Sequence, residues 1–149
     1  MSDYHFRVEA DLSAPLVAAA IHDGHRLRPE IAGLLALSPS QRLREEDPFT
    51  AEWTRVAPNR VVVGTSRFEV DLNRPREEAV YRTPREAWGL ELWKEPPPEP
   101  LVSRSLALYD SFYRGMAGLL DGLAERFGNF VVYDLHSYNH RRAGPQAPP

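Results

Sequence analysis

Two histidines stand directly behind apolar segments that have the character of buried strands. His22 follows residues 16–21 (LVAAAI), and His136 follows residues 130–135 (FVVYDL). Ligand sites in open α/β sheets lie at the carboxyl ends of the strands, so both imidazoles are expected at one edge of a sheet. Two imidazoles and one carboxylate make a catalytic zinc shell that keeps a coordination position for water. The pattern therefore predicts a zinc site.

The third ligand of such a site can come from an acidic run between the two histidines. Glu45, Glu46 and Asp47 close the charged segment 42–47 (RLREED). Asp134 lies two residues before His136, so on a strand it points to the same side and can orient the imidazole. Taken alone, each feature has a simpler interpretation, because a histidine at a strand end is most often solvated and a charged run is most often an exposed helix face.

The elements that must position these residues alternate between strands and helices. Apolar runs predict buried strands at 16–21, 60–64 and 130–135, and Thr50 is expected to cap a helix that continues through Val56. Apolar residues spaced by three and four predict a long helix over 101–127, which ends at Gly128. This order predicts an α/β fold whose mostly parallel sheet carries helices on both faces.

Composition narrows the classes of function. The chain has 149 residues, of which 42% are hydrophobic, and these suffice for one domain with its own core. The net charge of -3 gives no attraction to nucleic acid, and no apolar run reaches the roughly 20 residues of a membrane helix. The absence of cysteine excludes thiolate ligands. Without a visible signal peptide, we expect a cytoplasmic protein with a single domain at 1–144 and a proline-rich tail at 145–149.

Four motifs in this chain resemble those of the N-formylglutamate amidohydrolase family. Residues 66–74 (SRFEVDLNR) are similar to its SR…DLNR signature, and residues 133–138 (YDLHSY) to its D-x-HS signature. Residues 22–24 (HDG) are similar to its H-S-G motif, with Asp23 in place of serine, and residues 46–50 (EDPFT) to its acidic motif. The four motifs span about 21–138 in the family's order. Related motifs occur in zinc carboxypeptidases and aspartoacylases.

The resemblance implies a three-layer α/β sandwich of the zinc carboxypeptidase type, with His22 and His136 as zinc ligands. The acidic ligand comes from Glu46 or Asp47; we assign Asp47 to the metal and Glu46 to catalysis. His25 is a further candidate ligand, because relatives with an H-x-x-E motif carry their acidic ligand at this position.

The substrate side of the site also follows from the resemblance. Arg67 would polarise the scissile carbonyl, and Asn73 with Arg74 would bind a substrate carboxylate. A planar guanidinium holds a carboxylate through two parallel hydrogen bonds, which agrees with this role. Asp71 would hold an arginine or the backbone in place.

The function expected from these residues is zinc-dependent hydrolysis of the amide in an N-acyl acidic amino acid such as N-formylglutamate. The alternatives are a carboxypeptidase-like or aspartoacylase-like deacylase and a non-catalytic carboxylate-binding domain. The related enzymes carry their acidic general base in later strands, so we expect a chain that is incomplete at its C-terminus, weakly active at most, and prone to form a homodimer. A base within the chain would have to be Glu46, Asp47 or Glu69.

Overall fold

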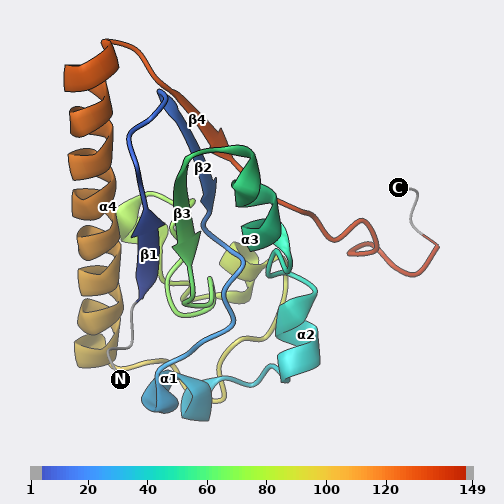
Figure 1. Ribbon diagram of the computed structural model, residues 1–149. Coiled ribbons are helices and arrows are strands. Elements are labelled where there is room, and N and C mark those ends of the chain that lie inside the picture. The colour runs from blue at the N-terminus through green and yellow to red at the C-terminus, as the bar shows by residue number, and fades with distance from the viewer. Residues whose placement is uncertain (1–4, 147–149) are drawn as a thin grey trace.

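The computed structural model describes residues 5–146 of the chain, which contain one mixed sheet with helices on both faces (Figure 1). From residue 147 onward, the predicted tail lies outside the described residues.

The sheet has four strands in the order β1-β3-β2-β4. The strands are β1 (Phe6–Glu9), β2 (Leu16–Ala20), β3 (Asn59–Val63) and β4 (Val131–Asp134). β2 pairs in parallel with both β3 and β4, whereas β1 runs antiparallel to β3. The predicted α/β class and mostly parallel sheet are confirmed. β1 was not predicted, because its four residues are too few to show a period.

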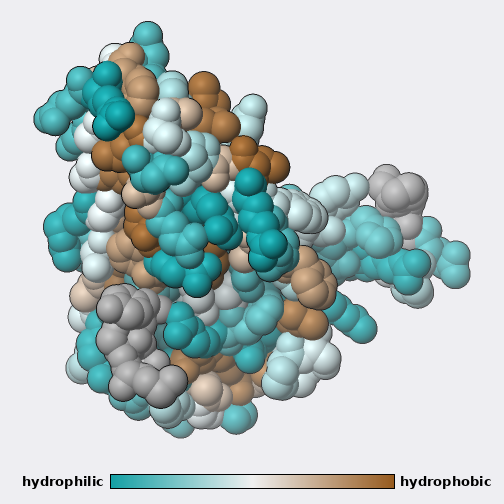
Figure 2. All heavy atoms as spheres, viewed as in Figure 1, coloured by the Kyte–Doolittle hydropathy of each residue, from teal (hydrophilic) through white to brown (hydrophobic). Residues whose placement is uncertain are grey.

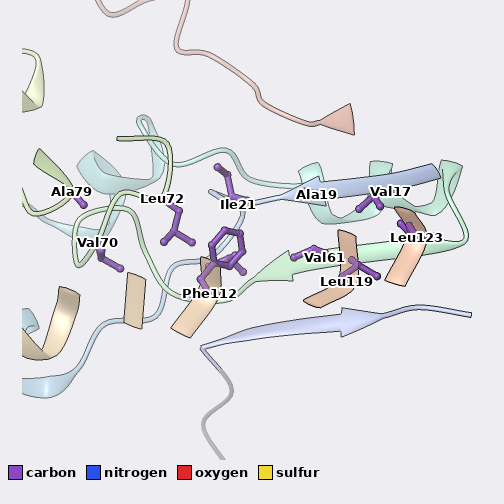
Figure 3. Close-up of a cluster of buried hydrophobic side chains, with 11 residues drawn as sticks. Val17, Ala19, Ile21, Val61, Val70, Leu72, Ala79, Phe112, Leu119 and Leu123 are labelled. Carbon is purple, nitrogen blue, oxygen red and sulfur yellow. The ribbon is translucent and has the colours of Figure 1, made fainter. Parts of the chain in front are cut away.

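A long helix, α4 (Glu99–Phe127), covers one face of the sheet. Alternate residues of β2 and β3, such as Val17 and Val61, meet Phe112, Leu119 and Leu123 of this helix in the main hydrophobic core (Figure 3). Gly128 ends the helix with φ of 78°, a conformation that glycine adopts without strain. The helix predicted over 101–127 is therefore confirmed.

Short helices lie on the other face and in the connections. They are α1 (Pro29–Leu34), α2 (Pro39–Leu43), α3 (Thr50–Trp53) and the 3-10 helices η1 (Thr54–Val56), η2 (Arg76–Glu78) and η3 (Pro84–Ala87). α3 and η1 contact β2, opposite α4. The expected cap at Thr50 is wrong. Phe49 is the N-cap residue, with φ of 72°, and Thr50 is the first helical residue, whose hydroxyl donates to the Asp47 carbonyl at 2.7 Å.

β4 differs most from its prediction as a buried strand. All four of its residues are exposed, and hydrophobic side chains reach the surface in this region (Figure 2). β4 is the last strand of the sheet and pairs only with β2, so one backbone edge and much of both faces stay open. A short apolar run has no period that separates a central strand from an edge strand, which explains the error. No helix among residues 5–146 is long and apolar enough to cross a membrane.

Candidate metal centre and its surroundings

Two histidines and one aspartate converge at the carboxyl end of the parallel strands. His22 follows β2, His136 follows β4, and Asp47 lies in the loop between α2 and α3. One ligand atom from each residue lies within 4.8 Å of the other two. Because β2 and β4 are parallel neighbours, the residues that follow them come to the same edge of the sheet.

Asp47 occupies the middle of this cluster. Its Oδ2 lies 2.8 Å from His136 Nδ1 and 3.6 Å from His22 Nδ1. The backbone N–H of Asp47 donates to the His22 carbonyl at 2.9 Å, which ties the acidic loop to the end of β2. His22 and Asp47 are buried, whereas His136 is partly exposed, so the cluster opens to solvent on the side of His136.

Each imidazole also contacts a second carboxylate through its Nε2 atom. His22 Nε2 lies 2.7 Å from Asp71 Oδ1, and His136 Nε2 lies 3.0 Å from Asp134 Oδ2. Metal-binding histidines characteristically use their second nitrogen in this way. Within residues 5–146, the buried Nδ1 of His22 has no hydrogen-bond partner, so it is available to a metal ion. This orphaned nitrogen and the two-nitrogen, one-oxygen donor set fit zinc.

The carboxylates of the cluster stabilise positive charge. Hydrogen bonds to Asp134 and Asp47 raise the pKa of His136 to about 9, so a metal ion that binds its Nδ1 must displace a proton from this imidazole. Burial alone would raise the pKa of Asp47, but the hydrogen bond from His136 and the nearby His22 imidazole outweigh it and lower this pKa to about 2. Asp47 is thus ionised at neutral pH, as a metal ligand must be.

Asp71 connects this centre to Arg67. Asp71 is fully buried; its Oδ2 accepts from Arg67 Nη2 at 2.8 Å and from the Tyr81 hydroxyl, and its Oδ1 accepts from the Asn73 backbone N–H at 2.9 Å. Burial opposes ionisation, yet the hydrogen bond from His22 and the charge of Arg67 keep the pKa of Asp71 well below its usual range. One carboxylate therefore orients both a candidate metal ligand and the candidate carbonyl-polarising group.

Asn73 and Arg74 lie two and three residues after Asp71 in the chain. The Arg74 guanidinium lies over the Tyr81 ring at 5.3 Å and donates to the Glu86 carbonyl at 2.9 Å. Among residues 5–146, its nearest carboxylates are Asp71 and Glu78, both 3.9 Å away, so none of these residues forms a close ion pair with its guanidinium. Asn73 lines a groove of about 360 Å³ between α4 and β4.

The other acidic candidates lie outside the cluster. The Glu46 carboxylate accepts from His25 Nδ1 at 2.6 Å, from Arg42 at 3.2 Å and from the Ser66 hydroxyl. Glu69 is buried and forms an ion pair with Arg28, which is partly exposed. The structure therefore brings Asp47 to the two candidate ligand histidines, and it brings the side chains of Glu46 and His25 into contact with each other.

Three residues near the cluster were not predicted to belong to the site. Tyr81 donates its hydroxyl to Asp71, and Trp88 and Arg142 stack on each other next to Arg67. No motif contains them, and their positions depend on contacts between segments that are distant in the sequence. Only the placement of Trp88 immediately before Gly89 hints at an unusual turn.

Comparison with known proteins identifies one family and one related structure. The family model for N-formylglutamate amidohydrolase matches residues 14–149. A crystal structure of N-formylglutamate amidohydrolase from Ralstonia eutropha JMP134 is similar to this chain with a TM-score of 0.72 and 16% sequence identity. The similarity covers 89% of this chain and 57% of that one, so the chain spans little more than half the length of this neighbour. No curated protein matches.

Proposed function

The chain belongs to the N-formylglutamate amidohydrolase family, and we propose on this basis that it carries the metal centre of a zinc-dependent amidohydrolase of the zinc carboxypeptidase-like fold. Its substrate class would be an N-acyl acidic amino acid such as N-formylglutamate. The observation that carries the proposal is the pair of imidazoles that meet at Asp47, each held from behind by an outer carboxylate.

His22, Asp47 and His136 would hold the ion. A zinc ion bound there supplies Lewis acidity towards the substrate carbonyl and lowers the pKa of a water molecule. Asp71 and Asp134 keep the two rings in position, so the ligands need little rearrangement when the ion binds.

Arg67 would stabilise negative charge on the carbonyl oxygen during attack. Burial disfavours its charge, but Asp71 outweighs this and raises the pKa of Arg67, so it stays protonated. Its contacts with Asp71, the Tyr81 hydroxyl and the Glu45 carbonyl hold the guanidinium in place before substrate arrives. A donor positioned in this way stabilises a developing oxyanion by about 3–4 kcal/mol.

Asn73 and Arg74 would bind the carboxylate of the substrate. Arg74 is fixed by the Tyr81 ring and the Glu86 carbonyl, and in the described part of the chain no carboxylate lies closer to its guanidinium than 3.9 Å. A fork that is held in place but lacks a close ion pair can accept a carboxylate in a bidentate manner.

Glu46 would act in proton transfer through His25. Glu46 is buried, and its Oε2 holds His25 Nδ1 at 2.6 Å, while the His25 side chain is 48% exposed. A buried carboxylate that orients an exposed imidazole is a common arrangement for general acid–base chemistry. This assignment gives Glu46 a role that agrees with its position outside the metal cluster.

A second function, carboxylate binding without catalysis, is favoured by one observation. The carboxylates of both Glu46 and Glu69 are already hydrogen-bonded to other side chains, so neither is free to accept a proton from water directly. If the Glu46–His25 pair transfers no proton, the centre would bind substrate and turn it over slowly at best.

The test combines metal content with turnover. The purified chain should retain about one zinc ion per molecule, and His136→Ala should abolish this, whereas His140→Ala, an exposed histidine nearby, should not. Release of formate and glutamate from N-formylglutamate would support the enzyme. Zinc and substrate binding without turnover would support the binding domain, and a chain that retains no zinc would contradict both.

A further inference from the structure

Two arginines stack on one tryptophan beside the candidate metal centre. The guanidinium carbon of Arg67 lies 4.7 Å from the centre of the Trp88 ring, and that of Arg142 lies 4.6 Å from the same centre. Trp88 follows η3 with φ of 55°, a conformation that non-glycine residues rarely adopt. The fold therefore holds this indole in an unusual backbone conformation where it contacts both cations.

Glu45 links the same two arginines from the other direction. Its carbonyl accepts from Arg67 Nη1 at 3.1 Å, while its carboxylate accepts from Arg142 Nε at 2.9 Å, from Arg142 Nη2, and from Asn139 Nδ2 at 2.9 Å. The segment that follows β4 is thereby anchored beside Arg67.

Arg142 still has hydrogen-bonding capacity. Its side chain is 42% exposed, and within residues 5–146 no hydrogen bond uses its Nη1. A guanidinium that is fixed on one edge by Glu45 and on one face by Trp88 presents its remaining N–H groups in a defined direction. Little side-chain entropy is then lost when an anion binds to them.

A second aromatic ring connects Arg142 to Arg74. The rings of Trp88 and Tyr81 meet edge to face at 5.8 Å, and Arg74 lies over Tyr81. Three arginines thus contact the two adjoining rings. One of them, Arg67, donates a hydrogen bond to the buried Asp71. Arg74 and Arg142 remain as two separate cationic groups on this aromatic pair.

We propose that Arg142, stacked on Trp88, binds the second carboxylate of a dicarboxylate substrate, while Arg74 binds the first. The inference rests on the proposed function and assigns the selectivity for an acidic side chain to a residue outside the four motifs. Hydrogen bonds to a charged partner make such a contact worth roughly ten- to a hundredfold in affinity.

The experiment measures binding to the zinc-loaded chain by titration calorimetry. The two ligands are glutarate, an unreactive dicarboxylate, and butyrate, which is glutarate without one of its two carboxylate groups. The parent protein should prefer glutarate. Arg142→Ala should lose this preference with little change for butyrate, Arg142→Lys should retain part of it, and Arg141→Ala, the exposed neighbour, should keep it in full.

Three results would overturn the inference: a parent protein without preference for glutarate, an Arg142→Ala variant that keeps the preference, and equal losses for both ligands. Equal losses would mean that Arg142 only anchors its own segment through Glu45. Formate release from N-formylglutamate is measured separately. A chain that selects glutarate through Arg142 but releases no formate would refute the proposed enzyme and leave this binding role standing.

Discussion

Replacing Asp71 by asparagine tests the carboxylate that joins the candidate metal centre to Arg67. Each carboxylate oxygen of Asp71 accepts two hydrogen bonds, Oδ1 from His22 and the Asn73 backbone and Oδ2 from Arg67 and Tyr81. In either orientation of the amide, its NH₂ group would face two donors. The substitution also removes the negative charge that pairs with Arg67. The side chain of Arg67 is only 11% exposed, so its positive charge would be left without a partner in a largely buried position.

The expected loss is large compared with the stability of a domain. Breaking a buried ion pair by removing one partner costs about 3–5 kcal/mol. The whole free energy of unfolding of a typical domain is about 5–15 kcal/mol. Losing the carboxylate behind a metal-binding histidine lowers metal affinity about 10- to 100-fold. Asp71→Asn should therefore lower both the free energy of unfolding and the affinity for zinc.

Denaturant titration followed by circular dichroism measures the first quantity, and competition with a chelator measures the second. Asp110→Asn is the matched control, because Asp110 also pairs with an arginine, Arg76 Nε at 2.7 Å, but on the exposed surface of α4. That variant should behave as the parent does. If Asp71→Asn unfolds at the same denaturant concentration as Asp110→Asn and binds zinc equally well, the role assigned to Asp71 is wrong.

Three further predictions concern other parts of the chain. Arg74→Lys keeps the charge but removes the fork, so affinity for N-formylglutamate should fall about tenfold; calorimetric titration giving the parent's affinity would rule out the assigned contact. Burial and Arg26 lower the pKa of His5 to about 4, so this histidine is neutral in the folded state and the stability it confers is lost as the pH falls from about 6.5 towards 4. His5→Asn should flatten this part of the stability profile by about 1–2 kcal/mol after a discount for partial exposure, and an unchanged slope in denaturation between pH 7 and 4 would refute it. The open edge of β4 should promote self-association, and Tyr133→Lys should reduce it. If light scattering gives the same mass for the parent and the Tyr133→Lys variant at all concentrations, this prediction is wrong.

Local patterns were enough to predict the elements that carry the candidate metal centre. The strands before His22 and His136 are continuous apolar runs, and the long helix has a clear apolar stripe ended by glycine, so each is specified within its own segment. Pairing in the sheet then brings the two histidines together, which follows from the general rule for parallel strands. Whether a strand is central or at an edge depends on its neighbours, and for this reason the exposure of β4 was not predictable.

Contacts between distant segments explain what the sequence did not reveal about the site. Asp71 was expected to hold an arginine or backbone, and it also holds His22, which is 49 positions away in the chain. Arg142 meets Glu45 across 97 positions and reaches Trp88 as well. No local period or spacing in the sequence predicts these contacts, because they form only when the loops at the end of the sheet pack together.

The acidic run at 45–47 shows how one local pattern can supply three different functions. Its residues follow α2 in irregular backbone, so successive side chains are not confined to one face as they would be in a helix. Glu45 contacts Arg142, Glu46 contacts His25 and Ser66, and Asp47 contacts the two candidate ligand histidines. All three are buried, and each is compensated by a cation or hydrogen-bond donors, as buried carboxylates must be. The run is therefore not the solvated helix face that its composition alone suggests, because three separate partners, contributed by distant segments, draw it into the interior.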